Sequence, residues 1–279
     1  MSHIIHGEVS QLSPLVRRIT APHPGVMTGP GTNSYLVGHK EVALIDPGPA
    51  IESHLDAIEA AINESPGQLR WILCTHTHLD HSPGANPLRQ RTGAAVIGMA
   101  TPNSKNQDGD FNPDEQWAHN SAIETPEFTL KAIHTPGHAS NHLCFYLQQE
   151  ALLFTGDHIM EGSTVVIAPP DGDMKAYLES LEDLKNTELN TLAPAHGNLI
   201  EKPLDVINGL IRHRLMRESK TLAGMKKAGP GTIEELTPVV YDDVPSALHP
   251  IARYSLQAHL EKLLKENRVA EHNGQWQLP

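Results

Sequence analysis

Short apolar runs with the length of β-strands recur along the first 200 residues. They occupy 33–38, 41–46, 70–75, 94–99, 127–134, 142–148, 151–155 and 191–194. Between them, residues 51–63 and 173–186 place apolar side chains at helical spacing, and a short helix is expected from about Pro87. Residues 38–40 link the first two strands as a hairpin turn. Strands alternating with helices predict an α/β fold in which helices and sheets pack in layers.

The pattern changes beyond residue 202. Residues 203–227 predict a long, partly basic helix, which the sequence AGPGT then interrupts. Thr232 and Glu235 have the spacing of a capping box, which predicts a second helix after the break. A third helix is expected at 250–267, followed by a hairpin turn at Asn273-Gly274. We therefore expect one domain over residues 1–202, and a helical linker with a winged-helix-like domain over residues 203–279.

Residues 100–126 are rich in Asn, Asp, Gly and Pro. This composition favours a long surface loop. A loop of that length is often functional, so we expect a lid over a binding site.

The formal net charge of −12 is unevenly distributed. Residues 1–200 contain 10 Lys and Arg against 23 Asp and Glu, whereas residues 201–279 contain 11 against 10. An acidic body argues against nonspecific adhesion to nucleic acid, but it is compatible with a local basic groove. Such a groove is one interpretation of the helix at 203–227, which carries Arg212, His213, Arg214 and Arg217, then Lys220, Lys226 and Lys227. A solvated helix face is the other interpretation.

No apolar run approaches the ~20 residues that cross a bilayer, and the N-terminus lacks the basic and apolar segments of a secretory signal. We therefore expect no membrane association. Cys74 and Cys144 lie in apolar runs and are expected to be buried, reduced thiols. Both observations favour a cytoplasmic location.

The main chemical signal follows the apolar run at 70–75. Four potential metal ligands fall within six residues there: His76, His78, Asp80 and His81. Side chains alternate on an extended chain, so His76 and His78 point the same way. Asp80 and His81 follow as the chain turns towards a helix, which can direct them to a second position nearby. Grouped imidazoles and carboxylates without a cation would leave several polar groups to satisfy, so we predict a metal site.

Three later strand ends each offer one further metal-competent residue. His138 follows the Pro-Gly turn of HTPGH, Asp157 ends the sequence FTGD, and His196 lies in PAHG. Each of these alone is weak evidence, because single polar residues at strand ends are often structural. Together they indicate that one edge of a sheet gathers ligands.

In this order, HTHLDH, HTPGH, TGD and PAHG resemble the metallo-β-lactamase superfamily. The resemblance implies an αββα four-layer sandwich with two metal ions. It assigns one ion to His76, His78 and His138, the other to Asp80, His81 and His196, and makes Asp157 the bridge between them. It also places Asp46 beside the site, where we expect it to orient the ligand loops.

The nitrogen and oxygen ligands suit two divalent ions, with zinc expected and iron or manganese as alternatives. By the resemblance, a metal-bridging hydroxide is the nucleophile, and Asp80 accepts a hydrogen bond from it in addition to its role as a ligand. The absence of a cysteine ligand and of an export signal argues against β-lactam hydrolysis. The chain looks more like the glyoxalase II and ribonuclease branches.

The C-terminal helices and hairpin resemble those of the LACTB2-like endoribonucleases, and so does the segment 29–37 (GPGTNSYLV). That segment is either a turn over the metals or a simple strand start. The substrate stays open between single-stranded RNA and a small-molecule ester, thioester or lactone.

Three further alternatives remain. A di-iron oxidoreductase would use the same ligands, although members with flavin carry a Glu in the motif and a flavin domain that this chain lacks. The tail could bind nucleic acid by itself, but its small net charge favours a packing role or a homodimer. His142 and His158 either touch the substrate or form structural hydrogen bonds.

Overall fold

The computed structural model describes residues 4–64 and 67–279. The chain forms two compact units. The first contains the described residues of 1–135, together with 141–163 and 188–203. The second contains 136–140, 164–187 and 204–279. No helix among the described residues combines the length and the apolar character needed to cross a membrane.

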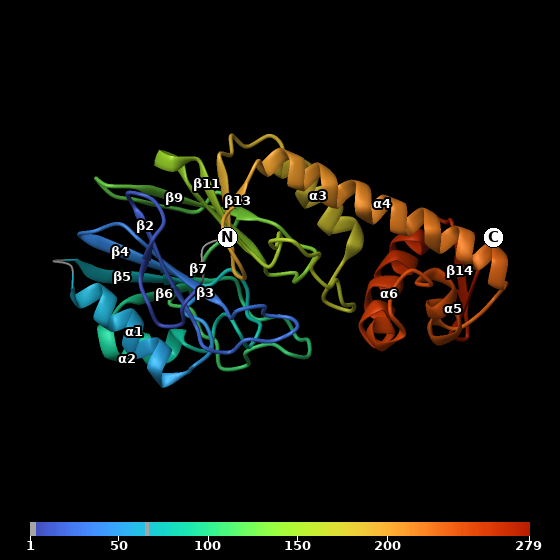
Figure 1. Cartoon of the computed structure of the whole chain (residues 1–279), viewed down its shortest axis with the longest axis horizontal. Helices are drawn as coiled ribbons and strands as arrows, with labels where there is room; N and C mark the ends of the chain where they lie inside the picture. The colour runs from blue at the N-terminus through green and yellow to red at the C-terminus, as the bar shows by residue number, and fades with distance from the viewer. Residues whose placement is uncertain (1–3, 65–66) are drawn as a thin grey trace. The chain divides into compact units, whose positions relative to one another are not determined.

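The first unit contains two sheets (Figure 1). The strands of the first sheet lie in chain order: β1 (Ser10–Gln11), β2 (Val16–Thr20), β3 (Asn33–Val37), β4 (Glu41–Ile45), β5 (Gln68–Leu73), β6 (Ala95–Gly98) and β7 (Glu115–Gln116). The pairs from β1 to β4 are antiparallel, whereas the pairs from β4 to β7 are parallel. The parallel strands therefore bring their carboxyl ends to one edge.

The second sheet has the order β13 (Ile200–Glu201), β12 (Thr191–Pro194), β11 (Leu152–Gly156), β10 (Leu143–Leu147), β9 (Thr129–His134) and β8 (Ala122–Glu124). A short 3-10 helix, Gln148–Glu150, connects β10 to β11. Among the described strand pairs of this second sheet, only β11 with β12 is parallel. These two strands consequently end at the same edge.

Two apolar layers hold this unit together. One contains Tyr35, Ile45 and Leu73 from the first sheet with Phe145 and Phe154 from the second. The other lies between the opposite face of the first sheet and the helices α1 (Glu52–Asn63) and α2 (Ala85–Thr92), which are visible below the sheet in Figure 1. The predicted layering of helices on sheets is thus confirmed for this unit.

The sequence pattern did not predict strand β2. Arg17 and Arg18 interrupt its apolar residues, yet every residue of the strand is buried. The two terminal nitrogens of the Arg17 guanidinium donate to the carbonyls of Ala61 and Gly38, whereas its buried Nε makes no hydrogen bond. Within the predicted loop at 100–126, residues 115–116 form β7 and residues 122–124 form β8, and the rest of the segment contains neither helix nor strand.

The second unit is mainly helical. It contains α3 (Met174–Leu184), α4 (from Pro203 at the boundary to Ala228), α5 (Ile233–Val240), the 3-10 helix Ser246–Leu248, α6 (His249–Lys265), β14 (Ala270–His272) and β15 (Gln275–Gln277). Its core includes Leu236, Leu256, Leu260 and Trp276. The predicted capping box of Thr232 and Glu235 is present.

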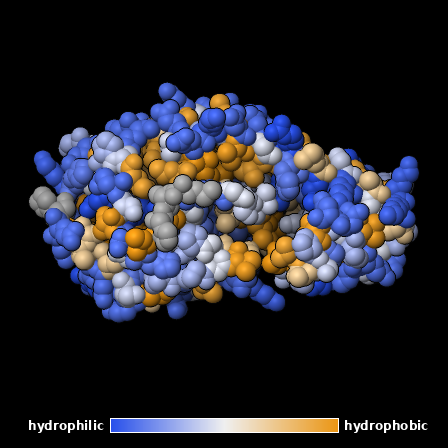
Figure 2. Space-filling model, viewed as in Figure 1, coloured by the Kyte–Doolittle hydropathy of each residue, from blue (hydrophilic) through white to orange (hydrophobic). Residues whose placement is uncertain are grey.

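The hairpin turn at Asn273-Gly274 is also confirmed. Both residues have positive φ, as the turn between β14 and β15 requires. On the surface, hydrophilic residues cover much of the face in Figure 2, and apolar residues reach it in patches.

Candidate metal site

Three of the predicted ligand segments emerge at strand ends in the first unit. The segment from His76 to His81 follows β5, Asp157 directly follows β11, and His196 follows the parallel neighbour β12. The two sheets meet at this edge, where Leu143 at the start of β10 donates its N–H to the carbonyl of Thr75 at 2.7 Å. The sheet topology therefore gathers these side chains.

Asp80, His81, His196 and Asp157 are spaced as the ligands of one ion would be. His196 Nε2 lies 3.4 Å from Asp80 Oδ2 and 3.3 Å from Asp157 Oδ1. His81 Nε2 lies 3.5 and 3.6 Å from the same two oxygens. Atoms around a tetrahedral zinc ion at about 2.0–2.1 Å are about 3.3–3.4 Å apart. The four distances are too long for good hydrogen bonds and suit a shared metal.

His81 supplies an independent test of that fit. Its side chain is fully buried, and its Nε2 has no hydrogen-bond partner. The opposite nitrogen, Nδ1, lies 2.9 Å from Asp46 Oδ2 and must donate, because a carboxylate only accepts. Nε2 is left with the lone pair, as a metal ligand requires. Asp46 also accepts from the N–H and the hydroxyl of Thr75, so its expected place beside the ligand loops is confirmed.

The segment 29–37 holds His196. Nδ1 of His196 donates to the carbonyl of Gly31 at 3.1 Å, which leaves the lone pair on Nε2. Thr32 pairs with His196 in an isolated β-bridge, and Asn33 donates to Ala195 at 2.7 Å. Gly31 has φ +129°, and a Cβ there would lie 2.0 Å from the carbonyl oxygen of Ala21. Only glycine fits this position.

His76 and His78 form the start of a second group. The Thr75 hydroxyl donates to Asp46, so it can accept a hydrogen bond from Nδ1 of His76 at 3.0 Å. This arrangement gives Nε2 of His76 the lone pair, and that atom lies 2.9 Å from Nδ1 of His78. His76, His81 and Asp157 also present ligand atoms within 4.8 Å of one another. Asp157 is therefore close to both groups.

His138 lies in the short segment 136–140, which belongs to the second unit. Its Nδ1 donates to the carbonyl of Val166 at 2.7 Å, because a carbonyl only accepts. The segment leaves the first unit at Thr135 and returns at Asn141, and the N–H of Thr135 donates to the carbonyl of His142 at 2.9 Å. The chain thus constrains His138 at both ends of a short excursion.

The charges of the cluster suit a divalent cation. Burial opposes ionisation of Asp157, but the neighbouring His196 and His81 hold the pKa of its carboxyl well below the usual range. Asp80 behaves similarly: burial would raise its pKa, and His81 lowers it. Burial lowers the pKa of His196, but the charge of Asp157 raises it, to about 10. The two ionised carboxylates therefore require positive charge beside them, which protonated imidazoles supply and which a divalent cation that replaces the Nε2 protons would also supply.

His142 and His158 are not placed to touch a substrate, since both side chains are fully buried. The N–H of Asp157 lies 3.2 Å from Nε2 of His142, whose other nitrogen bonds with the Thr135 hydroxyl. A Cβ on Gly156 would lie 2.6 Å from the same imidazole. Sequence reasoning left these roles open, and the structure favours the structural hydrogen-bonding role for His142.

The segment 100–126 lies against the metal motif. Asp108 donates its N–H to the carbonyl of Thr77 at 2.6 Å, and Gln107 pairs with His78 in an isolated bridge. Asn141 donates to the Thr77 hydroxyl at 2.8 Å. The segment therefore contacts the motif directly, and its expected role as a lid stays a prediction. Cys74 and Cys144 are buried and free, as predicted.

Three of the six Lys and Arg residues of α4 have structural partners. Arg217 bonds with Asp243 at 2.9 Å and stacks on Tyr241, Lys220 pairs with the acidic pair Asp242 and Asp243, and Arg214 is buried. No ion pair of Arg212, Lys226 or Lys227 is present among residues 4–64 and 67–279. The phosphate-binding face that the sequence suggested thus keeps three of its cations.

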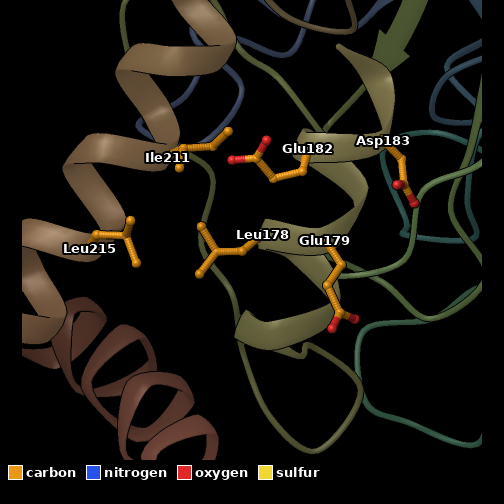
Figure 3. A pocket seen from close by; sticks show the side chains of 6 residues that line it. All are labelled: Leu178, Glu179, Glu182, Asp183, Ile211 and Leu215. Atoms are coloured by element: carbon orange, nitrogen blue, oxygen red, sulfur yellow. The ribbon is translucent and has the colours of Figure 1, made fainter. Parts of the chain in front are cut away.

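A groove in the second unit lies between α3 and α4 (Figure 3). Leu178 points from α3 towards Ile211 and Leu215 of α4, and Glu179, Glu182 and Asp183 complete the lining. None of the metal-competent groups in the described part of the chain includes these residues.

The model of the metallo-beta-lactamase superfamily matches residues 27–196. That of the beta-lactamase associated winged helix domain matches residues 232–276. Both matches agree with the sheets, helices and hairpin described above.

Similar curated proteins extend over nearly the whole chain. Beta-lactamase-like protein 2 homologs from Drosophila melanogaster and Caenorhabditis elegans are 30% and 29% identical, covering 94% and 96% of this chain and 91% of each relative. An atrochrysone carboxyl ACP thioesterase from a Cryptosporiopsis species is 28% identical, covering 93% of this chain and 81% of its own length.

Among solved structures, a metallo-beta-lactamase family protein from Thermus thermophilus superposes with a TM-score of 0.80 at 23% identity, covering 96% of this chain and all of its own. This likeness concerns the fold alone. With the family matches, it confirms the predicted metallo-β-lactamase fold and winged-helix tail. The chain therefore belongs to the metallo-beta-lactamase superfamily of hydrolase-type enzymes, with the winged helix domain that accompanies it in part of that family.

Proposed function

We propose that the chain is a dinuclear metal-dependent hydrolase that cleaves a small-molecule thioester. The observation that carries the metal assignment is the spacing of 3.3–3.6 Å among the ligand atoms of Asp80, His81, His196 and Asp157. We assign the second ion to Asp80, His81 and His196, and the first to His76, His78 and His138. Asp157 would contribute to both sites, in keeping with its proximity to His76 and His81. Zinc suits this donor set.

Two bound divalent ions would lower the pKa of a water molecule that they share and polarise the carbonyl of the substrate. Asp80 is the more exposed of the two ligand carboxylates, with 28% of its side chain accessible against 12% for Asp157. It is therefore the residue that can accept a hydrogen bond from the attacking water and orient it. Asp46 and Gly31 keep His81 and His196 in the tautomer that binds metal.

The thioester assignment has two supports. Two of the similar proteins are named atrochrysone carboxyl ACP thioesterases, at 28% and 31% identity. In addition, Arg214, Arg217 and Lys220 have structural partners on this chain, which reduces the basic surface available to RNA. Single-stranded RNA is the second candidate substrate. It is favoured by the remaining cations of α4, which have no ion pair among the described residues: Arg212, Lys226 and Lys227.

The test is a substrate panel with the full chain. Zinc-loaded protein would be given an acyl-N-acetylcysteamine thioester, the matching oxyester and a fluorescent single-stranded RNA. We expect the thioester to be cleaved fastest, with loss of all activity in the Asp157→Ala variant. Cleavage of RNA by the wild type, lost in the same variant, would replace the thioester with the second candidate.

A further inference from the structure

We propose that Arg214, on α4, is a positioning residue that fixes the orientation of His138. The proposal rests on the proposed role of His138 as a metal ligand. All the contacts that carry it lie within the second unit.

The short segment around His138 is held by the second unit at several points. The carbonyl of Gly137 accepts from the N–H of Asp173 at 2.8 Å, and the carbonyl of Pro136 accepts from the Ser180 hydroxyl at 2.9 Å. A Cβ on Gly137 would lie 2.4 Å from the Cα of Tyr177. The backbone of this segment therefore rests directly on α3.

The imidazole of His138 is oriented by one further bond. Its Nδ1 donates to the carbonyl of Val166 at 2.7 Å, which leaves the lone pair on Nε2. The direction of that carbonyl determines the direction of the ring. Whatever holds the peptide groups around Val166 consequently controls the proposed ligand.

Arg214 holds the neighbouring peptide. Its guanidinium donates to the carbonyl of Val165 at 2.5 Å and lies over the ring of Tyr177, 5.3 Å from the centroid. The carbonyls of Val165 and Val166 belong to successive peptide groups, so a shift of one rotates the other. Arg214 thus contacts two groups that hold the segment around His138. One is the backbone next to Val166, which accepts the hydrogen bond from His138, and the other is Tyr177, which lies against Gly137.

The burial of Arg214 agrees with a positioning role. Only 3% of the residue is exposed, its Nε makes no hydrogen bond, and no carboxylate pairs with it among residues 4–64 and 67–279. A guanidinium buried without a counter-charge carries a desolvation cost. Its planar fork nevertheless suits a fixed carbonyl better than a flexible ammonium would.

Arg212 provides a matched control. It lies two residues away on the same helix, is exposed, and forms no ion pair in the part of the chain that the structure describes. Arg214→Gln and Arg212→Gln each remove one positive charge and introduce the same neutral amide side chain. Only the first variant removes the bond to Val165.

The experiment measures zinc stoichiometry and affinity of the full chain by competition with a chelating indicator. We expect Arg212→Gln to match the wild type. Arg214→Gln should lower the affinity for one of the two zinc ions by about 10- to 100-fold, which is the range for residues that orient a metal ligand. Arg214→Lys, which keeps a donor, should recover part of the loss. The melting temperature and circular dichroism of each apo-protein report on folding separately.

A double mutant distinguishes this proposal from the proposed function. His138→Ala alone should lose the same ion, and adding Arg214→Gln should cause no further loss, because both act on one ligand. Additive losses, or equal weakening of both ions in Arg214→Gln, would overturn the positioning role. If His138→Ala keeps both ions at wild-type affinity, the ligand assignment itself is wrong, and the role of Arg214 falls with it.

Discussion

His81 donates its Nδ1 proton to the carboxylate of Asp46 at 2.9 Å, although 35 residues separate the two in the sequence. The same carboxylate accepts both the N–H and the hydroxyl of Thr75, the residue before the histidine motif. One buried acid therefore fixes the start of the motif and the orientation of one proposed ligand. Asp46 itself has a positive φ of 52°, which Asp and Asn tolerate better than other residues with side chains.

Asp46→Asn tests this relationship while keeping the backbone conformation. The amide NH2 cannot accept from His81, so the ring loses the partner that selects its tautomer. We expect the affinity for one zinc ion to fall about 10- to 100-fold. Isothermal titration of the apo-protein would measure it. An unchanged affinity would show that His81 needs no orienting carboxylate.

The proposed ligand sets predict the metal content of single variants. Wild-type protein should hold close to two transition-metal ions per chain, and His196→Ala should hold one. Elemental analysis of the purified proteins checks both values. Full activity with a single tightly bound ion would refute the dinuclear assignment.

Asp157 should be essential for hydrolysis and dispensable for folding. Asp157→Ala removes a ligand at the end of β11 but no core side chain, so the far-ultraviolet circular dichroism should stay the same. Activity should be abolished, because the variant loses the carboxylate proposed to bridge the ions. A variant that keeps both ions and the wild-type rate would mean that another residue bridges.

Gly31→Ala should damage both folding and the site. The new Cβ would lie 2.0 Å from the carbonyl oxygen of Ala21, at a φ that disfavours alanine. Backbone strain of this kind costs about 1–3 kcal/mol, which a urea titration can measure. Gly109→Ala is the control, since a Cβ there meets nothing within 4 Å. Equal stability of the two variants would contradict the strain argument.

The basic residues of α4 separate the two substrate classes. If RNA is the substrate, changing Arg212, Lys226 and Lys227 together to Ala should weaken its cleavage and flatten the salt dependence. Each phosphate contact on a single strand contributes about 0.7 to the slope of log affinity against log salt. Thioester cleavage should be unchanged by the triple variant. RNA cleavage that resists the change would exclude a phosphate-binding role for this face.

The segments that carry the proposed ligands could be identified because their signal is local. HTHLDH concentrates four donors in one short segment, and the capping box and the Asn-Gly turn also lie within a few residues. Strand β2 was not predicted for the opposite reason. The buried Arg17 donates to carbonyls that are distant in sequence, and the sequence VRRIT contains no sign of these partners.

The supporting residues were also beyond sequence reasoning. Gly31, His142 and Arg214 act through hydrogen bonds to residues far along the chain. Periodicity and motif spacing describe neighbours in sequence, whereas these contacts depend on how strands and helices pack. A glycine within GPGTN was visible as a turn, but its role beside His196 required the structure.

The position of Gly31 also bears on how enzymes of this architecture diversify. Residues 22–30 form an exposed excursion that returns to the sheet at this glycine, next to the strand end that carries His196. His23, within this excursion, is close enough to Asp80 and His196 for their charges to affect its pKa, so we expect changes along the excursion to alter what approaches the proposed metal site. A change at Gly31, where the excursion ends, would also affect His196, because the carbonyl of Gly31 accepts the hydrogen bond that orients that imidazole. We therefore expect substrate preference to vary with residues 22–30, whereas the proposed metal chemistry depends on Gly31 itself.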